Sequence, residues 1–421
     1  MEPSPLKILF ASNELVGLGH LRRTLKLAAC IQAELVNVSM LILTASDMAH
    51  AFPLPKGLDI IQIPGVRRSN EDPTTYCPLR LPLAFEDVGK LRAQIIRATA
   101  SAYHPDLFFV DYKPDGLAGE LIPTLRALKR RRQTKLVLIL RDILGDPTFV
   151  RERWLTDRAM EALTSYYDEI WVFGCQSLYD PIREYNIPAV IARKIRFCGY
   201  LDTGSSESLV AAREHIIRDF GVPTGAFVLV TIGGSSVGFA LLDTYMRALE
   251  RFPDELNVFS LLVGGPALSK EQREIIRQRC DTICSRFSRR CVQFTDFLPD
   301  LVDHMAAADV VVSLGGYNTV TEILRLGKRA LIIPYKGVHD EQVIRASLLE
   351  GFGLVRTIHL GRLSAEKLAE SVLDAIRDAP PTREQLQRLG IYFDGLQRFR
   401  INITRLLDQM SGVANSSKIR T

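Results

Sequence analysis

The sequence of 421 residues predicts an α/β protein made of two doubly wound, Rossmann-like halves. Short apolar runs alternate with stretches in which apolar residues recur at helical spacing. A small polar segment near residue 205 interrupts this alternation once, and glycine-rich turns follow apolar runs in both halves. A chain of this length also favours two or three domains over one.

The first half contains seven apolar runs with the length of β-strands. They are Lys7–Ala11, Ser39–Thr44, Asp59–Ile63, Leu107–Val110, Leu136–Leu140, Ile170–Phe173 and Ile195–Cys198. Between them apolar residues recur at helical spacing, as from Leu21 to Ala29 and from Leu91 to Ala98. Strands that alternate with helices in this way favour a parallel sheet covered on both faces.

The second half repeats the alternation after a linker. Asp202–Ser208 reads DTGSSES, which is small and polar and is the best linker candidate in the chain. Five strand-like runs follow, at Phe227–Ile232, Val258–Val263, Val292–Phe294, Val310–Ser313 and Ala330–Ile333. A helical pattern then covers Arg383–Met410. We therefore expect an N-terminal domain at 1–201, a linker at 202–215, a C-terminal domain at 216–380, and a helical segment with a tail at 381–421.

The composition limits the possible compartments and partners. A formal net charge of +5 suits an anionic ligand or an anionic membrane surface without requiring either. Seven cysteines without a C-x-x-C pair cannot form a full disulfide framework and lack zinc-site spacing. We find no signal peptide and no apolar run of membrane-spanning length. The expectation is a cytoplasmic protein, at most peripheral on the inner face of a membrane.

The turn Gly17-Leu18-Gly19-His20-Leu21-Arg22-Arg23 follows the first predicted strand and opens a helix. Glycines at such a turn let the backbone approach a ligand, and the helix N-terminus adds N–H groups with a partial positive charge. A histidine there would lie at the carboxyl ends of the strands, where open α/β sheets bind ligands. Its pKa suits proton abstraction near neutrality, so we expect His20 to be a general base. The structural alternative is an incidental surface histidine.

The turn Thr231-Ile232-Gly233-Gly234-Ser235-Ser236 follows the first strand of the second half. Two glycines and two serines offer closely spaced N–H and hydroxyl donors at a helix start, which suits a diphosphate. The sequence is neither G-x-G-x-x-G nor a Walker A motif, so a dinucleotide or a nucleoside triphosphate is not favoured. A glycine-rich turn capped by serine is the structural alternative.

Ser313-Leu314-Gly315-Gly316-Tyr317-Asn318-Thr319-Val320-Thr321-Glu322 also joins a strand to a helix. The carboxylate of Glu322 can accept hydrogen bonds from both hydroxyls of a ribose. The structural alternative is a capping box, in which Thr319 caps the helix and Glu322 occupies the third position. Asn318 is a second candidate for the cap.

Pro334-Tyr335-Lys336-Gly337-Val338-His339-Asp340-Glu341-Gln342 follows the run Ala330–Ile333. The adjacent acid and amide of Glu341 and Gln342 can hydrogen-bond several hydroxyls of a sugar. The structural alternative is again a helix N-terminus, with Asp340 as the cap and Glu341 favoured by the macrodipole.

Taken together, these segments resemble the donor-binding domain of inverting GT-B glycosyltransferases, with parallel sheets facing across a cleft. The resemblance rests on Ser313, Gly315, Gly316, Asn318, Thr319, Glu322, Gly327, Lys328, Pro334, Glu341, Gln342, Arg345, Ala346 and Gly353. The pattern is most similar to the N-acetylglucosaminyltransferases that make lipid II. The turn at Gly17–Arg23 resembles the matching loop of that superfamily and also that of the UDP-sugar hydrolases of pseudaminic acid synthesis. Unlike the lipid II enzymes, it lacks an extra glycine after Gly19 and has Arg23 where they have a proline.

The resemblance implies a role for each motif residue. The donor site would comprise Gly233, Gly234, Ser235 and Ser236 with Gly315 and Gly316 at the diphosphate, Glu322 at the ribose, and Glu341 and Gln342 at the sugar. Gly19, Asn318 and Thr319 would line the same sites. His20 would face the acceptor as general base, and Asp111, at the end of an N-terminal strand, would orient it. The structural alternative for Asp111 is the start of a turn before Pro114.

The implied activity is inverting transfer of a sugar from a nucleoside-diphosphate sugar, UDP-linked by resemblance, to a hydroxyl acceptor that could be lipid-linked. No D-x-D triplet is present, so neither a metal nor another cofactor is expected. Two alternatives remain: a nucleotide-sugar hydrolase on the same fold, and a non-catalytic nucleotide-sugar-binding protein. Nucleic acid is not expected as a partner, since the basic run Lys129–Arg132 is short. That run could instead meet anionic lipid beside the apolar segment Leu79–Phe85.

Overall fold

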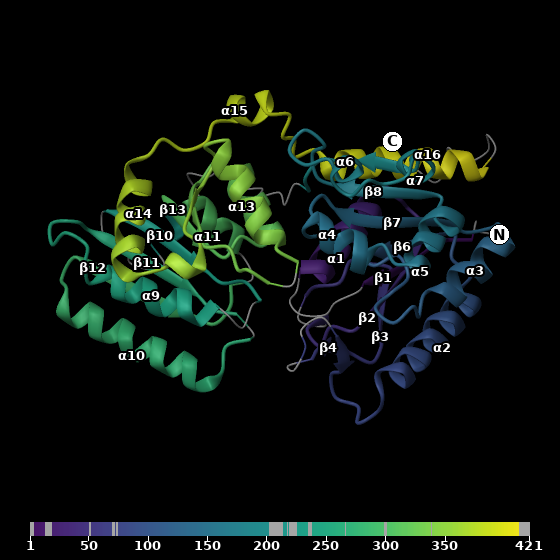
Figure 1. The fold of residues 1–421 in the computed structure, drawn as a ribbon, viewed down its shortest axis with the longest axis horizontal. Coiled ribbons are helices and arrows are strands. Elements are labelled where there is room, and N and C mark those ends of the chain that lie inside the picture. The colour runs from purple at the N-terminus through teal and green to yellow at the C-terminus, as the bar shows by residue number, and fades with distance from the viewer. Residues whose placement is uncertain are drawn as a thin grey trace. The chain divides into compact units, whose positions relative to one another are not determined.

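The computed structural model describes residues 4–12, 19–49, 52–69, 72, 75–201, 214–216, 218, 225–234, 238–265, 267–298, 301–337 and 339–411. The chain forms two compact units, residues 1–201 together with 391–421, and residues 202–390 (Figure 1). Each unit is an α/β domain with a parallel sheet, as predicted. Residues 202–213 of the predicted linker lie outside the described residues.

The first unit is built on a seven-stranded parallel sheet with the order β3-β2-β1-β6-β7-β8-β9. Its strands are β1 (Leu6–Ser12), β2 (Val38–Thr44), β3 (Leu58–Gln62), β6 (Leu107–Asp111), β7 (Lys135–Arg141), β8 (Glu169–Phe173) and β9 (Ile195–Phe197). All seven predicted runs are strands. Counted along the sheet's own strands, the order is 3-2-1-4-5-6-7, so the topological switch point lies between β1 and β6. A separate two-stranded antiparallel ribbon, β4 (Val66–Arg68) with β5 (Tyr76–Pro78), was not predicted.

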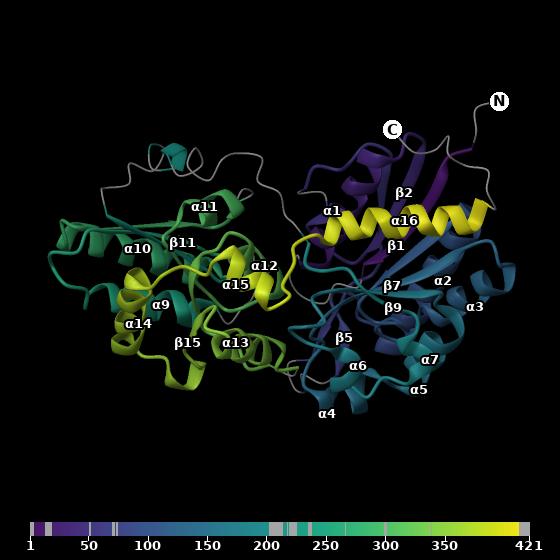
Figure 2. The ribbon, with the colours of Figure 1, turned by 90° about the horizontal axis from the view of Figure 1, so that it is seen from above.

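Helices cover both faces of this sheet (Figures 1 and 2). They are α1 (Gly19–Glu34), α2 (Phe85–Tyr103), α3 (Ile122–Arg131), α4 (Pro147–Phe149), α5 (Asp157–Glu161), α6 (Pro181–Glu184), α7 (Ala189–Ala192) and α16 (Gly395–Ser411), with π-helical turns at Val150–Trp154 and Ala162–Tyr166. The last of these helices, α16, is coloured yellow and packs beside α1 (Figure 2).

Aromatic packing explains why the last helix belongs to the first unit. Phe10 and Phe109 lie opposite each other on β1 and β6, with ring centroids 5.2 Å apart. Phe399 of α16 lies 5.9 Å from the ring of Phe109 and 5.5 Å from that of Trp171 on β8. Aromatic side chains bury large apolar areas and gain further from tilted ring contacts. Helix α16 therefore supplies part of the core of the first unit.

The second unit has a six-stranded parallel sheet with the order β12-β11-β10-β13-β14-β15. Its strands are β10 (Ala226–Thr231), β11 (Val258–Val263), β12 (Arg290–Thr295), β13 (Val310–Ser313), β14 (Arg329–Ile332) and β15 (Arg356–Thr357). The five predicted runs are strands, and among the strands in the described residues the two-residue β15 was not predicted. The order is again 3-2-1-4-5-6, which places the switch point between β10 and β13.

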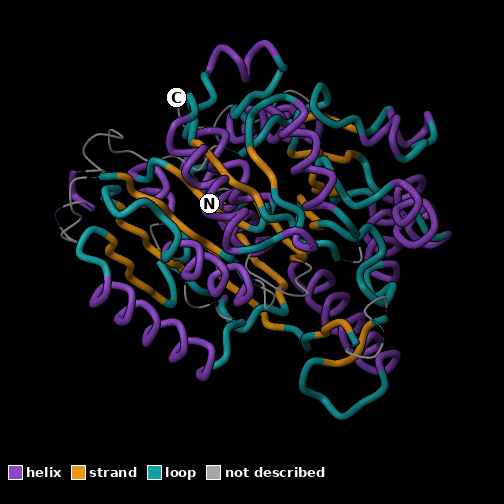
Figure 3. The backbone as a smooth tube through the Cα atoms, turned by 60° about the vertical axis from the view of Figure 1, so that its left-hand side comes forward, coloured by secondary structure: helices purple, strands orange, loops and turns teal. Residues whose placement is uncertain are grey.

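The helices of the second unit also follow its strands one by one along the chain. Figure 3 shows the helices in purple and the strands in orange. They are α9 (Phe239–Leu249), α10 (Lys270–Arg286), α11 (Leu301–Ala307), α12 (Tyr317–Arg325), α13 (Glu341–Gly351), α14 (Ala365–Arg377) and α15 (Arg383–Arg388), with a 3-10 turn at Leu360–Arg362. Val228 and Val230, which alternate along β10, face a core that includes Leu242 of α9 and Leu368 of α14. The helical pattern predicted over Arg383–Met410 consists of two helices, α15 in the second unit and α16 in the first.

Of the helices in the described part of the chain, none is both long enough and apolar enough to cross a membrane.

Candidate active site

His20 and Asp111 meet at the switch point of the first sheet. His20 is the second residue of α1, which follows β1, and Asp111 is the last residue of β6, the neighbouring strand. His20 Nδ1 lies 2.7 Å from Asp111 Oδ2, although the two residues are 91 positions apart in the sequence. Both side chains are largely buried, with 14% of His20 and 4% of Asp111 exposed. The carboxyl ends of parallel strands at a switch point are where such sheets bind ligands.

The charge state of Asp111 determines which nitrogen of His20 carries the proton. Burial alone would raise the pKa of Asp111, but the Arg23 guanidinium and His20 outweigh burial and lower it to about 2. The carboxylate is therefore ionised near neutral pH and can only accept a hydrogen bond. His20 Nδ1 must then donate its N–H to Asp111, which leaves a lone pair on Nε2. This is the tautomer that a general base needs.

Two arginines complete this cluster, and neither was predicted from the sequence to take part in it. Arg23, one turn along α1 with 2% of its side chain exposed, donates from Nη2 to Asp111 Oδ1. Arg141 ends β7, the strand next to β6, and its Nη2 lies 3.1 Å from His20 Nε2. A guanidinium has only donors, so Arg141 donates to the lone pair of Nε2. Burial, Arg141 and Arg23 together lower the pKa of His20 below its ordinary value of 6.5, against the opposing effect of Asp111.

Aromatic side chains border the His20 ring. The Tyr112 ring centroid lies 5.4 Å from that of His20, and Trp154 lies 6.4 Å from Tyr112. Tyr112 has a φ of 73°, a left-handed conformation that costs a residue with a Cβ about 1–3 kcal/mol. Its backbone N–H donates to Ile139 O of β7 at 2.9 Å, which holds the bend directly after Asp111.

In the second unit, the predicted donor-site turns begin at one edge of the sheet. Thr231 of β10 pairs with Ser313 of β13, and Ser313 pairs with Ile332 of β14. The carboxyl ends of the three strands therefore lie side by side. The turn at Gly233 and Gly234 follows β10. The other turns follow β13 and β14, and together they carry Gly315, Gly316, Glu341 and Gln342.

Gly265 brings a further turn to this edge. It lies in the turn after β11, and a Cβ at this position would stand 1.9 Å from Gly233 O, so no other residue fits without moving the backbone. Arg273 of α10 donates to Gly265 O at 2.8 Å. Gly265 was not predicted to belong to the site, although the glycine pair Gly264-Gly265 directly after an apolar run was the available signal in the sequence.

Arg345 of α13 ties two of the predicted turns together. Its Nη2 donates to Glu341 Oε1 at 2.8 Å, and its Nη1 donates to Gly315 O at 3.3 Å. The guanidinium carbon lies 5.5 Å from the ring centroid of Tyr317, and only 2% of the side chain is exposed. Gln342 Oε1 accepts a hydrogen bond from the Tyr335 N–H at 3.1 Å. Arg345 therefore joins Glu341 to Gly315, and Gln342 follows Glu341 in the first turn of α13.

Side-chain caps, the structural alternative for these helices, are not observed at α12 and α13, although Asp340 takes the N-cap position and Glu341 the first turn of α13. Helix α12 begins at Tyr317 with Gly316 as its N-cap and no side-chain cap, so Thr319 and Asn318 lie inside the first turn. Helix α13 has Asp340 at the N-cap position with a φ of 50°, but its side chain makes no capping hydrogen bond. Helix α9 also begins without a side-chain cap. Helix N-termini of this kind stabilise an anion by about 0.3–1 kcal/mol each, and by up to about 2 kcal/mol when partly buried.

Glu322 lies farther inside α12 than a capping residue and is 1% exposed. At that exposure a ribose reaches the carboxylate only if neighbouring side chains move.

Three further predicted site residues, Ser235, Ser236 and Gly17, lie outside the described residues, and Gly19 is the first residue of α1.

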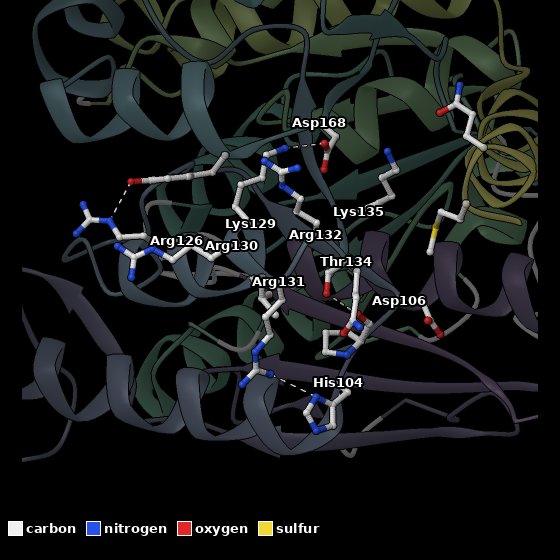
Figure 4. Close-up of a pocket in the computed structure, with 16 residues that line it drawn as sticks. His104, Asp106, Arg126, Lys129, Arg130, Arg131, Arg132, Thr134, Lys135 and Asp168 are labelled. Atoms are coloured by element: carbon white, nitrogen blue, oxygen red, sulfur yellow. Dashed lines mark hydrogen bonds and ion pairs between the residues drawn. The ribbon is translucent and has the colours of Figure 1, made fainter. Parts of the chain in front are cut away.

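A basic groove of about 1470 Å³ lies at the opposite, amino edge of the first sheet (Figure 4). Its cations are Arg126, Lys129, Arg130, Arg131, Arg132 and Lys135. Arg131 donates to His104, just after α2, at 3.3 Å, whereas Leu79–Phe85 reach only the start of α2. The 19 residues of α2 span roughly 28 Å. The basic run and the apolar segment therefore lie at opposite ends of α2 and not side by side, and a shared lipid-facing surface stays a prediction.

Comparisons with known proteins address the second unit most directly. Residues 227–388 match the family model described as glycosyltransferase family 28 C-terminal domain. The UDP-N-acetylglucosamine–N-acetylmuramyl-(pentapeptide) pyrophosphoryl-undecaprenol N-acetylglucosamine transferase of Sorangium cellulosum is 24% identical over 286 residues, 64% of this chain and 64% of that protein. The protein of the same name from Sinorhizobium medicae is 28% identical over 211 residues, 44% of this chain and 56% of that protein. These matches span less than two thirds of either relative.

Solved structures resemble the whole chain. The glycotransferase of kitacinnamycin has a TM-score of 0.62 at 16% identity and covers 97% of this chain and 100% of its own. A UGT transferase from Siraitia grosvenorii in complex with UDP scores 0.60 at 14% identity, with coverages of 95% and 99%. MurG of Acinetobacter baumannii scores 0.56 at 14% identity, with coverages of 96% and 100%. The chain therefore has the GT-B fold, and its residues 227–388 match the glycosyltransferase family 28 C-terminal domain.

Proposed function

We propose that this protein is a glycosyltransferase that moves a sugar from a UDP-sugar to a hydroxyl acceptor with inversion at the anomeric carbon. In this proposal the first unit provides the base and faces the acceptor, and the second unit holds the donor. No metal ion or further cofactor takes part. The acceptor could be lipid-linked, as in the activity that the curated relatives' names state.

The observation that carries the proposal is the contact between His20 and Asp111. It joins a residue expected to be a base to a carboxylate expected to orient it, at 2.7 Å. The ionised carboxylate keeps the proton on Nδ1 and would stabilise the imidazolium that forms during the reaction. A positioned base of this kind contributes about 10²–10⁴-fold to a rate.

The proposed reaction is one displacement. Nε2 of His20 takes the proton of the acceptor hydroxyl as that oxygen forms a bond to the anomeric carbon. The bond from the anomeric carbon to the diphosphate oxygen breaks, and UDP leaves with the electron pair. The first turns of α9, α12 and α13 would meet the negative charge on the leaving diphosphate.

Two observations support a nucleotide-sugar donor. Every donor-site residue expected from the sequence, from Gly233 to Gln342, falls within the family 28 domain at 227–388. The structures of similar fold include complexes with UDP and with UDP-glucose. UDP is therefore the nucleotide that we propose.

The pH dependence of the reaction follows from the surroundings of His20. The base must be neutral, so kcat/KM rises as pH increases through the pKa of His20 in the free enzyme. Burial, Arg141 of β7 and Arg23 of α1 lower this pKa, and Asp111 of β6 raises it, with a net lowering below 6.5. We expect the acid limb of the kcat/KM profile to lie below pH 6.5. An acid limb above pH 6.5 contradicts the assignment of His20.

Two variants separate the donor from the acceptor function. We expect Glu322→Gln to weaken UDP binding by about tenfold, measured by calorimetry, because one charged hydrogen-bond acceptor for the ribose is lost. His20→Gln should bind UDP as the wild type does but lose turnover of UDP-sugar. If both variants match the wild type in binding and turnover, the assignment fails.

The same measurements distinguish the alternatives. Rapid, stoichiometric release of free sugar in the absence of an acceptor favours the hydrolase. No binding at millimolar UDP favours a scaffold protein that has kept the fold.

A further inference from the structure

The basic groove at the amino edge of the first sheet holds most of the excess positive charge of the chain (Figure 4). Six cations and two carboxylates line it, an excess of four positive charges, whereas the whole chain has an excess of five. His20 and Asp111 lie at the other end of the strands, since Asp111 ends β6 and the groove lies where β6 begins. The proposed reaction therefore makes no use of this concentration of charge.

Four of the six cations have no carboxylate partner in the part of the chain that the structure describes. Arg126 pairs with Glu161 at 3.1 Å, and Lys129 pairs with Asp168 at 2.7 Å. The four cations that remain are Arg130, Arg131, Arg132 and Lys135. Because like charges held in one groove repel each other, an anion that binds among them lowers the electrostatic energy of the folded protein.

Hydrogen bonds fix the two turns that carry the groove. Thr134 Oγ1 donates to Pro105 O at 2.7 Å, and the Lys135 N–H donates to Asp106 O at 2.9 Å. The carboxylate of Asp106 accepts the N–H of Lys7, next to it on β1, at 2.8 Å. This carboxylate therefore serves the main chain of the sheet, and the backbone that presents the cations is already ordered. A preformed site loses less conformational freedom when a ligand binds.

The dipole of helix α3 accounts for only part of the cluster. Residues Lys129–Arg131 lie in its last turn, where the macrodipole stabilises cations. Arg132 follows the helix in a left-handed conformation, with a φ of 57°, and Lys135 is the first residue of β7. Helix stability therefore does not explain why cations from a helix, a turn and a strand line one groove.

The cations and the size of the groove favour phosphate groups, and more than one of them. Three of the four unpaired cations are arginines, whose planar guanidinium groups donate two parallel hydrogen bonds to a phosphate. A groove of about 1470 Å³ is larger than the roughly 300–1000 Å³ of most small-molecule sites, so a single phosphate would occupy little of it. Linked phosphates place several negative charges along such a groove.

The rest of the lining does not suit a nucleic acid or a bilayer. Tyr166, the aromatic residue of the lining, is buried and its hydroxyl donates to Glu161, so it offers no ring on which a base stacks. Leu128 is buried as well, which leaves no large apolar side chain for insertion among lipids. Lys129 and Lys135 are half-buried inside the groove, where the flat surface of a bilayer does not reach them.

We propose that this groove binds a soluble oligophosphate, an anion with two or more linked phosphate groups. The phosphates pair with Arg130, Arg131, Arg132 and Lys135. The site shares no residue with the proposed active site, so the proposal stands apart from the proposed function.

The first test titrates sodium tripolyphosphate into the full chain by calorimetry. Saturating UDP is present, because the proposed donor site also suits a diphosphate. We expect Arg130→Gln/Arg132→Gln to weaken binding about tenfold or more, since two charge-assisted hydrogen-bond donors are lost from exposed positions. The matched control is Lys56→Gln/Lys90→Gln, which removes the same charge from exposed positions outside the groove and should bind as the wild type does.

The second test offers two macromolecular anions to the same three proteins at physiological ionic strength. Vesicles of phosphatidylglycerol are followed by co-sedimentation, and a single-stranded oligothymidylate is followed by fluorescence anisotropy. We expect the wild type, the groove variant and the control to behave alike with both, because neither anion fits the groove as argued above.

Each outcome decides the proposal. Tripolyphosphate binding that is lost in the groove variant and kept in the control supports it. The absence of tripolyphosphate binding, or equal binding by the groove variant and the wild type, overturns it. Vesicle or oligonucleotide binding that the groove variant alone loses overturns the soluble ligand in favour of that partner. None of these measurements uses a donor sugar, so a failure of the proposed function leaves them unaffected.

Discussion

Replacing Asp111 by asparagine should lower kcat by about 10²–10⁴-fold, the usual contribution of a positioned general base. The asparagine side chain can present an N–H to His20 Nδ1, which would then have to be unprotonated. The proton moves to Nε2, and the base can no longer accept the proton of the acceptor hydroxyl. The measurement is steady-state turnover of UDP-sugar, with UDP binding as the check that the second unit is unaffected.

The design must separate catalysis from folding, because Arg23 also depends on Asp111. Arg23 is 2% exposed, and a buried charge that loses its partner destabilises a protein by about 3–5 kcal/mol. The double variant Arg23→Gln/Asp111→Asn removes the unpaired charge while keeping the tautomer change. Asp106→Asn is the matched control, since Asp106 lies just before the same strand and accepts the Lys7 N–H at 2.8 Å. A folded Asp111→Asn protein with kcat within tenfold of the wild type contradicts the assigned role.

The second large effect is on stability: Glu120→Ala should lower the free energy of unfolding of the first unit by about 3–5 kcal/mol. Glu120 and Arg92 are almost fully buried, with side-chain exposures of 0% and 1%. Glu120 Oε1 accepts from Arg92 Nε at 3.0 Å and Nη2 at 2.7 Å, and Oε2 accepts from the Ala118 N–H at 2.7 Å. Arg92 Nη1 donates to Pro64 O at 2.7 Å. The substitution leaves a buried guanidinium without its counter-ion.

Urea unfolding followed by tryptophan fluorescence measures this loss, since both tryptophans lie in the first unit. Lys90→Ala is the matched control on the same helix, because Lys90 pairs with Asp87 at 2.9 Å between exposed side chains and surface pairs contribute little. The double variant Arg92→Met/Glu120→Leu should be more stable than Glu120→Ala alone, because it removes both charges together. A midpoint for Glu120→Ala equal to that of the Lys90 control would show that the buried pair contributes little.

The sheets of this protein were predictable because local apolar runs mark their strands. The run Val258–Val263, for example, is buried at every position and matches β11 in full. Strand β15 was missed because two residues, Arg356 and Thr357, carry no periodicity, and the short ribbon β4–β5 was missed for the same reason.

Contacts between distant segments were harder to predict. The apolar face of α16 was visible in the sequence, but the helix beside which it packs, α1, was not. The two helices are far apart in the sequence, since Arg400 of α16 pairs with Glu34 of α1 across 366 positions. Arg141 was missed because its place beside His20 depends on the order of the strands, which no local pattern contains. The capping box at Thr319 was wrong because the N-cap of α12 lies three residues earlier, at Gly316, which has no side chain to form a cap.

The return of the chain to the first unit makes that unit depend on both ends of the polypeptide. A fragment that stops at Leu201 lacks Phe399, so the rings of Phe109 and Trp171 would be exposed to water. Such a fragment is expected to aggregate when expressed alone. The second unit, by contrast, consists of one continuous segment, residues 202–390. It is therefore the unit that could be excised, transplanted or produced separately with its core complete.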